Sequence, residues 1–108
     1  MELKRVVVTG LGAITPIGNS VPEFWENLVN GVSGAGPITH FDASLFKTQF
    51  ACEVKGFDAT KYIDRKEDRQ MDLYTQYAIA VAKEAEGDSG LDVEHTDLHR
   101  IGFIFGAG

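Results

Sequence analysis

The chain has 108 residues with a formal net charge of −6 at pH 7, and 44% of its residues are hydrophobic. A chain of this length can bury one modest core, and no apolar run approaches the roughly 20 residues that a transmembrane helix needs. The acidic balance argues against nonspecific binding to nucleic acid or to anionic membranes. A start with Glu2, Lys4 and Arg5 lacks the long apolar stretch of a signal peptide. The single cysteine, Cys52, excludes an internal disulfide and a cysteine-based zinc cluster. We therefore expect a soluble cytoplasmic protein without a metal or other cofactor.

The first predicted element is a strand over residues 4–9, which ends in a glycine turn. The β-branched run Val6 to Thr9 leads into Gly10-Leu11-Gly12. A dinucleotide fingerprint needs a third glycine at position 15, but Thr15 stands there and Pro16 follows it. The spacing Gly31 to Gly36 also fails as a phosphate loop, because Pro37-Ile38 replaces the required Lys and Ser or Thr. A nucleotide-binding α/β module is therefore the disfavoured alternative.

A first helix is predicted from Ser20 to Gly31. Ser20 and Glu23 fit a capping box, in which Glu23 reaches back to the Ser20 amide. Gly31 is placed to end the helix, and residues 31–42 are expected to form a loop. Helical spacing predicts one apolar face packed in the core, formed by Val21, Phe24, Trp25, Leu28 and Val29.

A second strand is predicted over residues 48–56, where apolar residues at 50, 52 and 54 alternate with others. This phase places Cys52 in the core as a packed thiol. A catalytic thiol needs an electropositive site such as a helix N-terminus or a neighbouring histidine, so Cys52 is not expected to be a nucleophile. His40, His95 and His99 do not match metal-ligand spacings and are interpreted as surface or loop-bracing residues.

The rest of the chain predicts a second helix and a third strand. A capping box at Asp64 and Glu67 precedes apolar residues at helical spacing, and the helix is expected to end near Glu86, before Gly87 to Gly90. Residues 100–108 are apolar on both faces, as a buried central strand requires. Because a domain seldom stops inside such a strand, we expect residues 1–108 to be the incomplete N-terminal part of a longer domain. The predicted order is β-α-loop-β-α-β, which is an α/β pattern.

Short motifs along the whole chain resemble the opening of the β-ketoacyl-[acyl-carrier-protein] synthases, the decarboxylating condensing enzymes of the thiolase-like superfamily. The motifs are Arg5 to Gly12, Thr15 to Asn19, Phe24-Trp25, Ser33-Gly34, His40-Phe41-Asp42, Arg65 to Asp72, Asp88 to Leu91 and Arg100 to Gly102. Phe41 to Ser44 and Phe50 to Phe57 resemble the elongating synthase II branch most. The resemblance implies the N-terminal portion of a layered α-β-α-β-α fold.

The same resemblance implies an acyltransferase of fatty acid synthesis. A cysteine thiolate accepts an acyl group, and malonyl-carrier protein is then decarboxylated and attacks the acyl-enzyme. Two histidines and backbone amides support that chemistry in the family. The nucleophile and both histidines are expected beyond Gly108, so no catalytic residue is assigned in this chain, and residues 1–108 alone are predicted to be inactive. A homodimer is also implied.

The strongest candidate site is a basic cluster in this acidic chain. Lys61, Arg65, Lys66 and Arg69 place four of the ten basic residues at positions 61–69. Arg65, Lys66 and Arg69 would share one helical face, and acidic carrier proteins dock on such patches. In the family, basic residues at this helix start contribute to carrier-protein recognition, although Gln70 stands where relatives often carry another basic residue. The alternative is a solvated helix end paired internally with Asp64, Glu67 and Asp68.

One further alternative function stays open. A noncatalytic ketosynthase-like subunit, of the type that sets chain length, shares the N-terminal half and lacks the nucleophilic cysteine. The sequence beyond Gly108 would distinguish it from a synthase.

Overall fold

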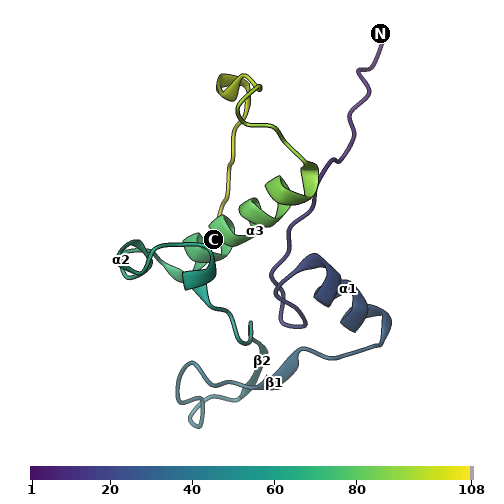
Figure 1. The fold of residues 1–108 in the computed structure, drawn as a ribbon. Helices are drawn as coiled ribbons and strands as arrows, with labels where there is room; N and C mark the ends of the chain where they lie inside the picture. The colour runs from purple at the N-terminus through teal and green to yellow at the C-terminus, as the bar shows by residue number, and fades with distance from the viewer. Residues whose placement is uncertain (108) are drawn as a thin grey trace. The chain divides into compact units, whose positions relative to one another are not determined.

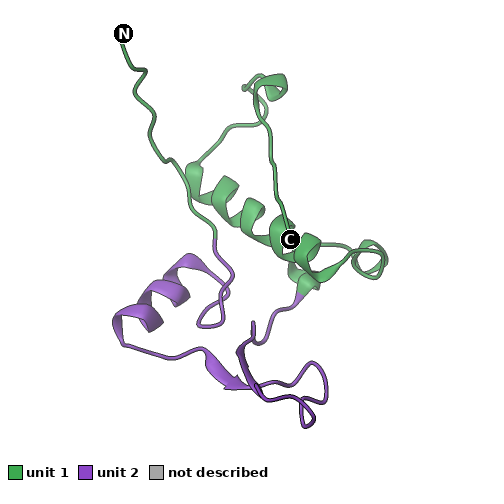
Figure 2. Ribbon diagram, turned by 180° about the vertical axis from the view of Figure 1, so that it is seen from behind, with its two compact units in different colours: residues 1–12, 59–108 green, residues 13–58 purple. Residues whose placement is uncertain are grey.

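The computed structural model describes residues 1–107, and Gly108, the last residue of the third predicted strand, lies outside them. The elements are α1 (Val21–Val29), β1 (Ala35–Pro37), β2 (Phe50–Cys52), α2 (Arg65–Asp68) and α3 (Leu73–Ser89), with short 3₁₀ turns at Ala59–Lys61 and Leu98–Arg100 (Figure 1). The chain divides into two compact units, which are described separately. Unit 1 holds residues 1–12 and 59–108, and unit 2 holds residues 13–58 (Figure 2).

Helix α1 in unit 2 begins and ends where the sequence predicts. The Ser20 side chain accepts a hydrogen bond from the Glu23 amide at 3.3 Å, while the Glu23 carboxylate accepts from the amide of Asn19, one residue before the position expected. At the other end Gly31 has φ of +69°, which an L side chain rarely adopts. The Val32 amide donates to Asn27 and the Gly31 amide to Leu28, which together form a Schellman motif. Both ends are therefore fixed by local hydrogen bonds.

The apolar face of α1 differs from the prediction, because it lies at the surface of the described structure. Trp25 is 62% exposed, and Leu28 and Val29 are also exposed. Periodicity predicts which residues share a face, whereas burial needs a second layer packed on that face. Within unit 2 the described residues provide no such layer, so the prediction that Trp25 lies in the core is wrong here.

The two strands form an antiparallel ribbon in unit 2, with Ala35 opposite Cys52 and Pro37 opposite Phe50. Strand β1 lies inside the predicted loop 31–42, and β2 is shorter than the predicted strand 48–56. The predicted phase is also wrong, because Phe50 is 67% exposed and Cys52 is exposed, while Ala51 between them is half-buried. The reason is again a missing layer: no described element covers the Phe50 and Cys52 face of a ribbon that is only two strands wide.

A carboxylate fixes the loop between the two strands. Glu53 accepts hydrogen bonds from the Thr39 amide at 3.0 Å and from the Thr39 hydroxyl at 2.8 Å. The His40 amide donates to the same carboxylate at 3.3 Å, and the His40 ring lies 3.8 Å away. These bonds, led by the Thr39 hydroxyl, lower the pKa of Glu53 below its ordinary value of 4.5.

The second predicted helix is two helices in unit 1. Asp64 does not cap α2 through its side chain, and neither does Asp72 cap α3. Asp72 has an extended backbone with ψ of 152°, which interrupts the helix between α2 and α3. The side-chain amide of Gln76 in α3 donates to the carbonyls of Asp68 and Met71. Backbone carbonyls at and just after the end of α2 thus receive hydrogen bonds from α3. Helix α3 then runs past the predicted end to Ser89, where Gly90 with φ of +66° terminates it.

Residues 4–9 and 100–108 are the predicted strands, but Arg100 ends the 3₁₀ turn Leu98–Arg100. Residues 4–9 and 101–107 have no strand partner among the described residues. Apart from Ile101, which is half-buried, their large apolar side chains are exposed, and Ile104 is 98% exposed. Pairing is a property of neighbours, so a segment with strand-like composition forms no ladder until another strand lies beside it. The α/β prediction holds for the helices and the small ribbon, while the predicted strand order is not observed.

The glycine turn passes directly along α3. A methyl group on Gly12 would overlap the carbonyl oxygen of Val81, and one on Gly10 would overlap that of Ala85. The Leu11 amide between them donates to the Asp88 carboxylate at 3.0 Å. Glycine is required at both positions because the backbone of the turn contacts the backbone of the helix.

We predict that Gly12→Ala destabilises the protein by about 2 kcal/mol or more, because the new methyl group forces the turn off α3. The matched control is Gly87→Ala in α3, the helix that the turn contacts, because an added methyl group there meets nothing within 4 Å. It should stabilise the protein by up to about 1 kcal/mol through helix propensity. Urea unfolding measures both changes, and equal midpoints for the two variants would contradict the close contact.

We predict that protonation of Glu53 weakens unit 2 in acid. Because its pKa is lowered on folding, its contribution is fully present above pH 4.5, the ordinary value, and is lost as the pH falls through the lowered pKa. The midpoint temperature of thermal unfolding should therefore fall less steeply from pH 7 to pH 3 for Glu53→Gln than for the unmodified protein. Glu26→Gln, on the exposed surface of α1, is the control and should keep the original slope.

Candidate functional site

The predicted basic cluster lies on the surface of unit 1, around α2. Lys61 ends the 3₁₀ turn Ala59–Lys61, Arg65 and Lys66 open α2, and Arg69 is its C-terminal cap. Arg69 keeps helical dihedral angles, with φ of −66° and ψ of −15°, so Arg65, Lys66 and Arg69 remain within one helical turn although the helix is only four residues long. We call these three residues the basic turn.

The basic turn is exposed, and its charges are not neutralised inside the described part of the chain. Arg65, Lys66 and Arg69 are all exposed. The ion pairs within residues 1–107 join His40 to Glu53 and His95 to Asp92, and none involves the basic turn. The predicted alternative, internal pairing with Asp64, Glu67 and Asp68, is therefore not observed. Three cations on one exposed turn form a surface that an acidic partner can recognise through complementary charge.

The glycine turn cannot act as a phosphate cradle in this structure. Its Leu11 amide already donates to a carboxylate, that of Asp88, and a carboxylate repels a phosphate. The α-carbon faces of Gly10 and Gly12 are covered by the α3 backbone, so a pyrophosphate has no room there. Thr15, which stands at the third glycine position, instead closes a tight turn with Gly18 through two backbone hydrogen bonds of 2.8 and 3.2 Å. The motif Asp88 to Leu91 marked Asp88 as part of the family resemblance, but nothing in the sequence indicated that its carboxylate binds the amide of Leu11, 77 residues away.

The cysteine and the histidines are not assembled into a reaction centre. Cys52 lies on β2 and is exposed, so the prediction of a packed core thiol is wrong here. His40 and His95 lie on exposed loops beside Glu53 and Asp92, and His99 lies on the exposed turn Leu98–Arg100. The surface and loop-bracing prediction for the histidines is confirmed. Within residues 1–107, no group of three or more His, Cys, Asp or Glu side chains could hold a metal ion.

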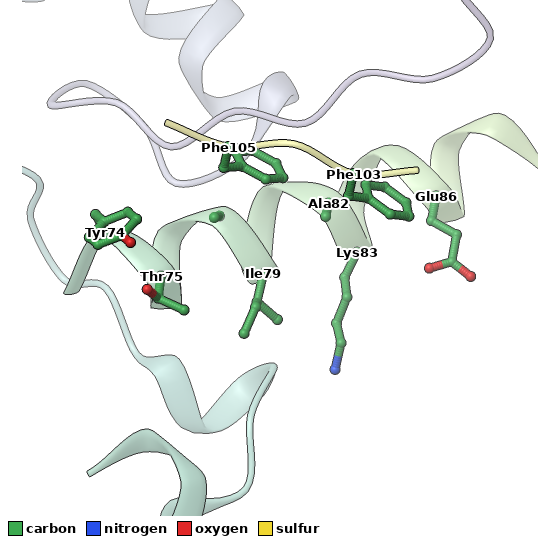
Figure 3. Close-up of a pocket in the computed structure, with 9 residues that line it drawn as sticks. Tyr74, Thr75, Ile79, Ala82, Lys83, Glu86, Phe103 and Phe105 are labelled. Atoms are coloured by element: carbon green, nitrogen blue, oxygen red, sulfur yellow. The ribbon is translucent and has the colours of Figure 1, made fainter. Parts of the chain in front are cut away.

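An apolar hollow of about 440 Å³ lies along α3, between the helix and the segment that carries Phe103 and Phe105. Figure 3 shows these two side chains lying over the helix close to Ala82. Lys83 and Glu86 are the charged residues of its lining, and the Lys83 ammonium donates to the Tyr62 carbonyl.

No described helix is long and apolar enough to cross a membrane.

The chain belongs to the family described as beta-ketoacyl synthase, N-terminal domain, whose match covers residues 3–108. It is 47% identical over 108 residues to 3-oxoacyl-[acyl-carrier-protein] synthase 2 of Synechocystis sp. and 46% identical over 108 residues to the protein of that name from Coxiella burnetii. All of this chain aligns in both cases, but only 26% of each relative does. The chain therefore spans about a quarter of the length of these curated relatives.

Two solved structures share the fold. The first, described as the ishigamide ketosynthase/chain length factor, has a TM-score of 0.74 and 41% identity over 82% of this chain and 22% of that chain. The second is described as AntDE:AntF, a type II PKS acyl-carrier protein in complex with its ketosynthase. It has a TM-score of 0.63 and 28% identity over 87% of this chain and 24% of that chain. The predicted family is thus confirmed.

We predict that the chain shows no saturable binding of NAD or ATP, because Asp88 and the α3 backbone occupy the positions that a phosphate would need. Isothermal titration at millimolar nucleotide measures this. A saturable site that Asp88→Asn strengthens would contradict the geometry and would restore the nucleotide-binding alternative.

Proposed function

We propose that the chain forms the N-terminal part of a 3-oxoacyl-[acyl-carrier-protein] synthase of fatty acid elongation. The observation that carries the proposal is the match along all 108 residues to two curated synthases at 46 and 47% identity. Such an enzyme joins an acyl group held on a cysteine to the carbanion from decarboxylated malonyl-carrier protein. The nucleophile and its two histidines would then lie beyond Gly108, and residues 1–108 alone would be inactive.

The proposal extends to the architecture and the location of the protein. In a thiolase-like layered fold, further strands would pair with residues 4–9 and 100–108 and cover the apolar side chains that are exposed in the described residues, such as Ile104. A homodimer and a cytoplasmic location are part of the same proposal. They rest on the family resemblance and on a single cysteine with no disulfide framework.

Within this function, we propose the basic turn as a docking surface for an acyl carrier protein. Its support is physical, because Arg65, Lys66 and Arg69 are exposed and form no ion pair within residues 1–107 of an acidic chain. Charges at the edge of an interface act mainly on the association rate and are screened by salt. Gln70 follows the basic turn and carries no charge. A basic residue at this position should therefore strengthen the attraction to an acidic partner.

A chain-length-setting, noncatalytic subunit is the second candidate function. The observation that favours it is the structural similarity to a ketosynthase/chain length factor. The coding sequence beyond residue 108 separates the two candidates, because a synthase requires the nucleophilic cysteine and the noncatalytic subunit lacks it.

The docking surface can be tested in a chimera in which this chain replaces the matching segment of the Synechocystis synthase. We predict that Lys66→Glu with Arg69→Glu lowers kcat/KM for a carrier-bound acyl donor by about tenfold at low salt, through slower association. Activity with a small acyl thioester should stay the same, because that donor has no carrier protein to dock at the basic turn. Gln70→Lys should raise kcat/KM for the carrier-bound donor.

The matched control for this test is Lys47→Glu, which reverses one exposed charge in the loop between β1 and β2. It should leave both activities unchanged. Equal kinetics of the double variant and the parent chimera with the carrier-bound donor would rule out docking at the basic turn.

A further inference from the structure

Three backbone carbonyl groups in unit 2 converge on a single ammonium group, that of Lys55. Its Nζ atom donates to the carbonyl oxygen of Gly34 at 2.9 Å, of Glu53 at 3.1 Å and of Pro16 at 3.4 Å. An ammonium group carries three donor hydrogens and accepts none, so the three carbonyls match its full donor capacity. The carbonyls come from three separate segments of the chain.

Each carbonyl is held in place by interactions that do not involve Lys55. Pro16 lies in the tight turn that Thr15 and Gly18 close with two backbone hydrogen bonds. Gly34 directly precedes β1, and Glu53 directly follows β2, so the pairing of Ala35 with Cys52 fixes both. Pro16 and Gly34 are also packed together, since a methyl group on Gly34 would lie 2.6 Å from the Pro16 Cβ atom.

The surroundings are polar and hold the main chain of Lys55 as well. The Asn19 side chain donates to the Lys55 carbonyl at 2.7 Å, and the Asn27 side chain donates to the Ile17 carbonyl at 2.6 Å. A hollow of about 230 Å³ adjoins the site and is lined in part by Thr15, Asn19 and Ser33 together with Lys55. The carbonyls are therefore held by interactions that are independent of the ammonium, and the site adjoins a hollow beside the exposed Lys55.

We propose that the carbonyl oxygens of Pro16, Gly34 and Glu53 form a binding site for a primary ammonium or a monovalent cation, which Lys55 fills from within the chain. Rings of preorganised carbonyl oxygens bind monovalent cations in other proteins by replacing their hydration shell. Here the bound charge joins the turn at Thr15 to the ribbon of β1 and β2. Loss of the charge leaves three carbonyls without their shared donor.

Chemical rescue tests the proposal in the intact protein. Lys55→Ala removes the ammonium and leaves space for a small cation, so it should lower the thermal midpoint. Methylammonium chloride should restore part of the loss, whereas tetramethylammonium chloride at equal concentration should not, because it carries the same charge without an N–H donor. In the control Lys47→Ala, which changes an exposed lysine with no partner among the described residues, the two salts should act alike. An equal response of Lys55→Ala to both salts would overturn the proposal.

A second measurement uses the unmodified protein and applies even where Lys55→Ala fails to fold. The three hydrogen bonds must break before Nζ can attack an acetylating reagent, so Lys55 should be acetylated about tenfold more slowly than Lys47. Mass spectrometry of partly labelled protein gives both rates from one sample. Equal rates for the two lysines would contradict the binding of the Lys55 ammonium by the carbonyls of Pro16, Gly34 and Glu53, which we call the carbonyl cradle.

Discussion

The contact between the glycine turn and α3 is the constraint on which unit 1 depends. Two residues along an extended strand advance about 6.6 Å, and four residues along a helix advance about 6.0 Å. Gly10 and Gly12 therefore meet the carbonyl groups of Ala85 and Val81, which are four residues apart on the helix. The hydrogen bond from Leu11 to Asp88 holds this register. The glycine turn can approach α3 so closely only because both of its contacting residues, Gly10 and Gly12, lack a side chain.

This contact also makes the glycine turn, whose motif resembles a phosphate site, unsuited to bind a phosphate. A phosphate-binding turn presents free amides to solvent at the start of the helix that follows it. In this chain the middle amide of the turn is bound to a carboxylate from α3, seventy-seven residues away in sequence. Gly10 and Gly12 allow the backbone of the turn to pack against the backbone of α3. The absence of a third glycine, where Thr15 stands before Pro16, agrees with that interpretation.

The features that sequence could predict are those fixed by neighbours in the chain. The ends of α1 were predictable because Ser20, Glu23 and Gly31 act on adjacent backbone groups. The basic turn was predictable because its charges are clustered within one helical turn. Strand β1 was not, because Ala35-Gly36-Pro37 has little strand preference and is defined by its pairing with β2. The burial of Trp25 and Cys52 was predicted wrongly for a related reason, since a face is buried only where another layer packs on it. Lys55 gave no signal in the sequence, because its three partners are backbone carbonyls and two of them, Pro16 and Gly34, lie far from it in the chain.

The features described in the two units are structural contacts and a charged surface. The glycine contact in unit 1 and the carbonyl cradle in unit 2 build a framework, and the basic turn is the part of the described surface suited to an acidic partner. Within residues 1–107, Cys52 and the histidines are exposed and lie apart, with His40 beside Glu53 and His95 beside Asp92. The framework is thus visible in the described residues, while docking at the basic turn and the condensation reaction are proposals for the family to which the chain belongs.

The most direct test is the condensation activity of the chimera in which this chain replaces the matching quarter of the Synechocystis synthase. If the chain is the N-terminal part of such an enzyme, the chimera should elongate a carrier-bound acyl group at a rate comparable with that of the parent enzyme, and the isolated 108 residues should be inactive. A chimera that folds like its parent but forms no β-ketoacyl product would contradict the account.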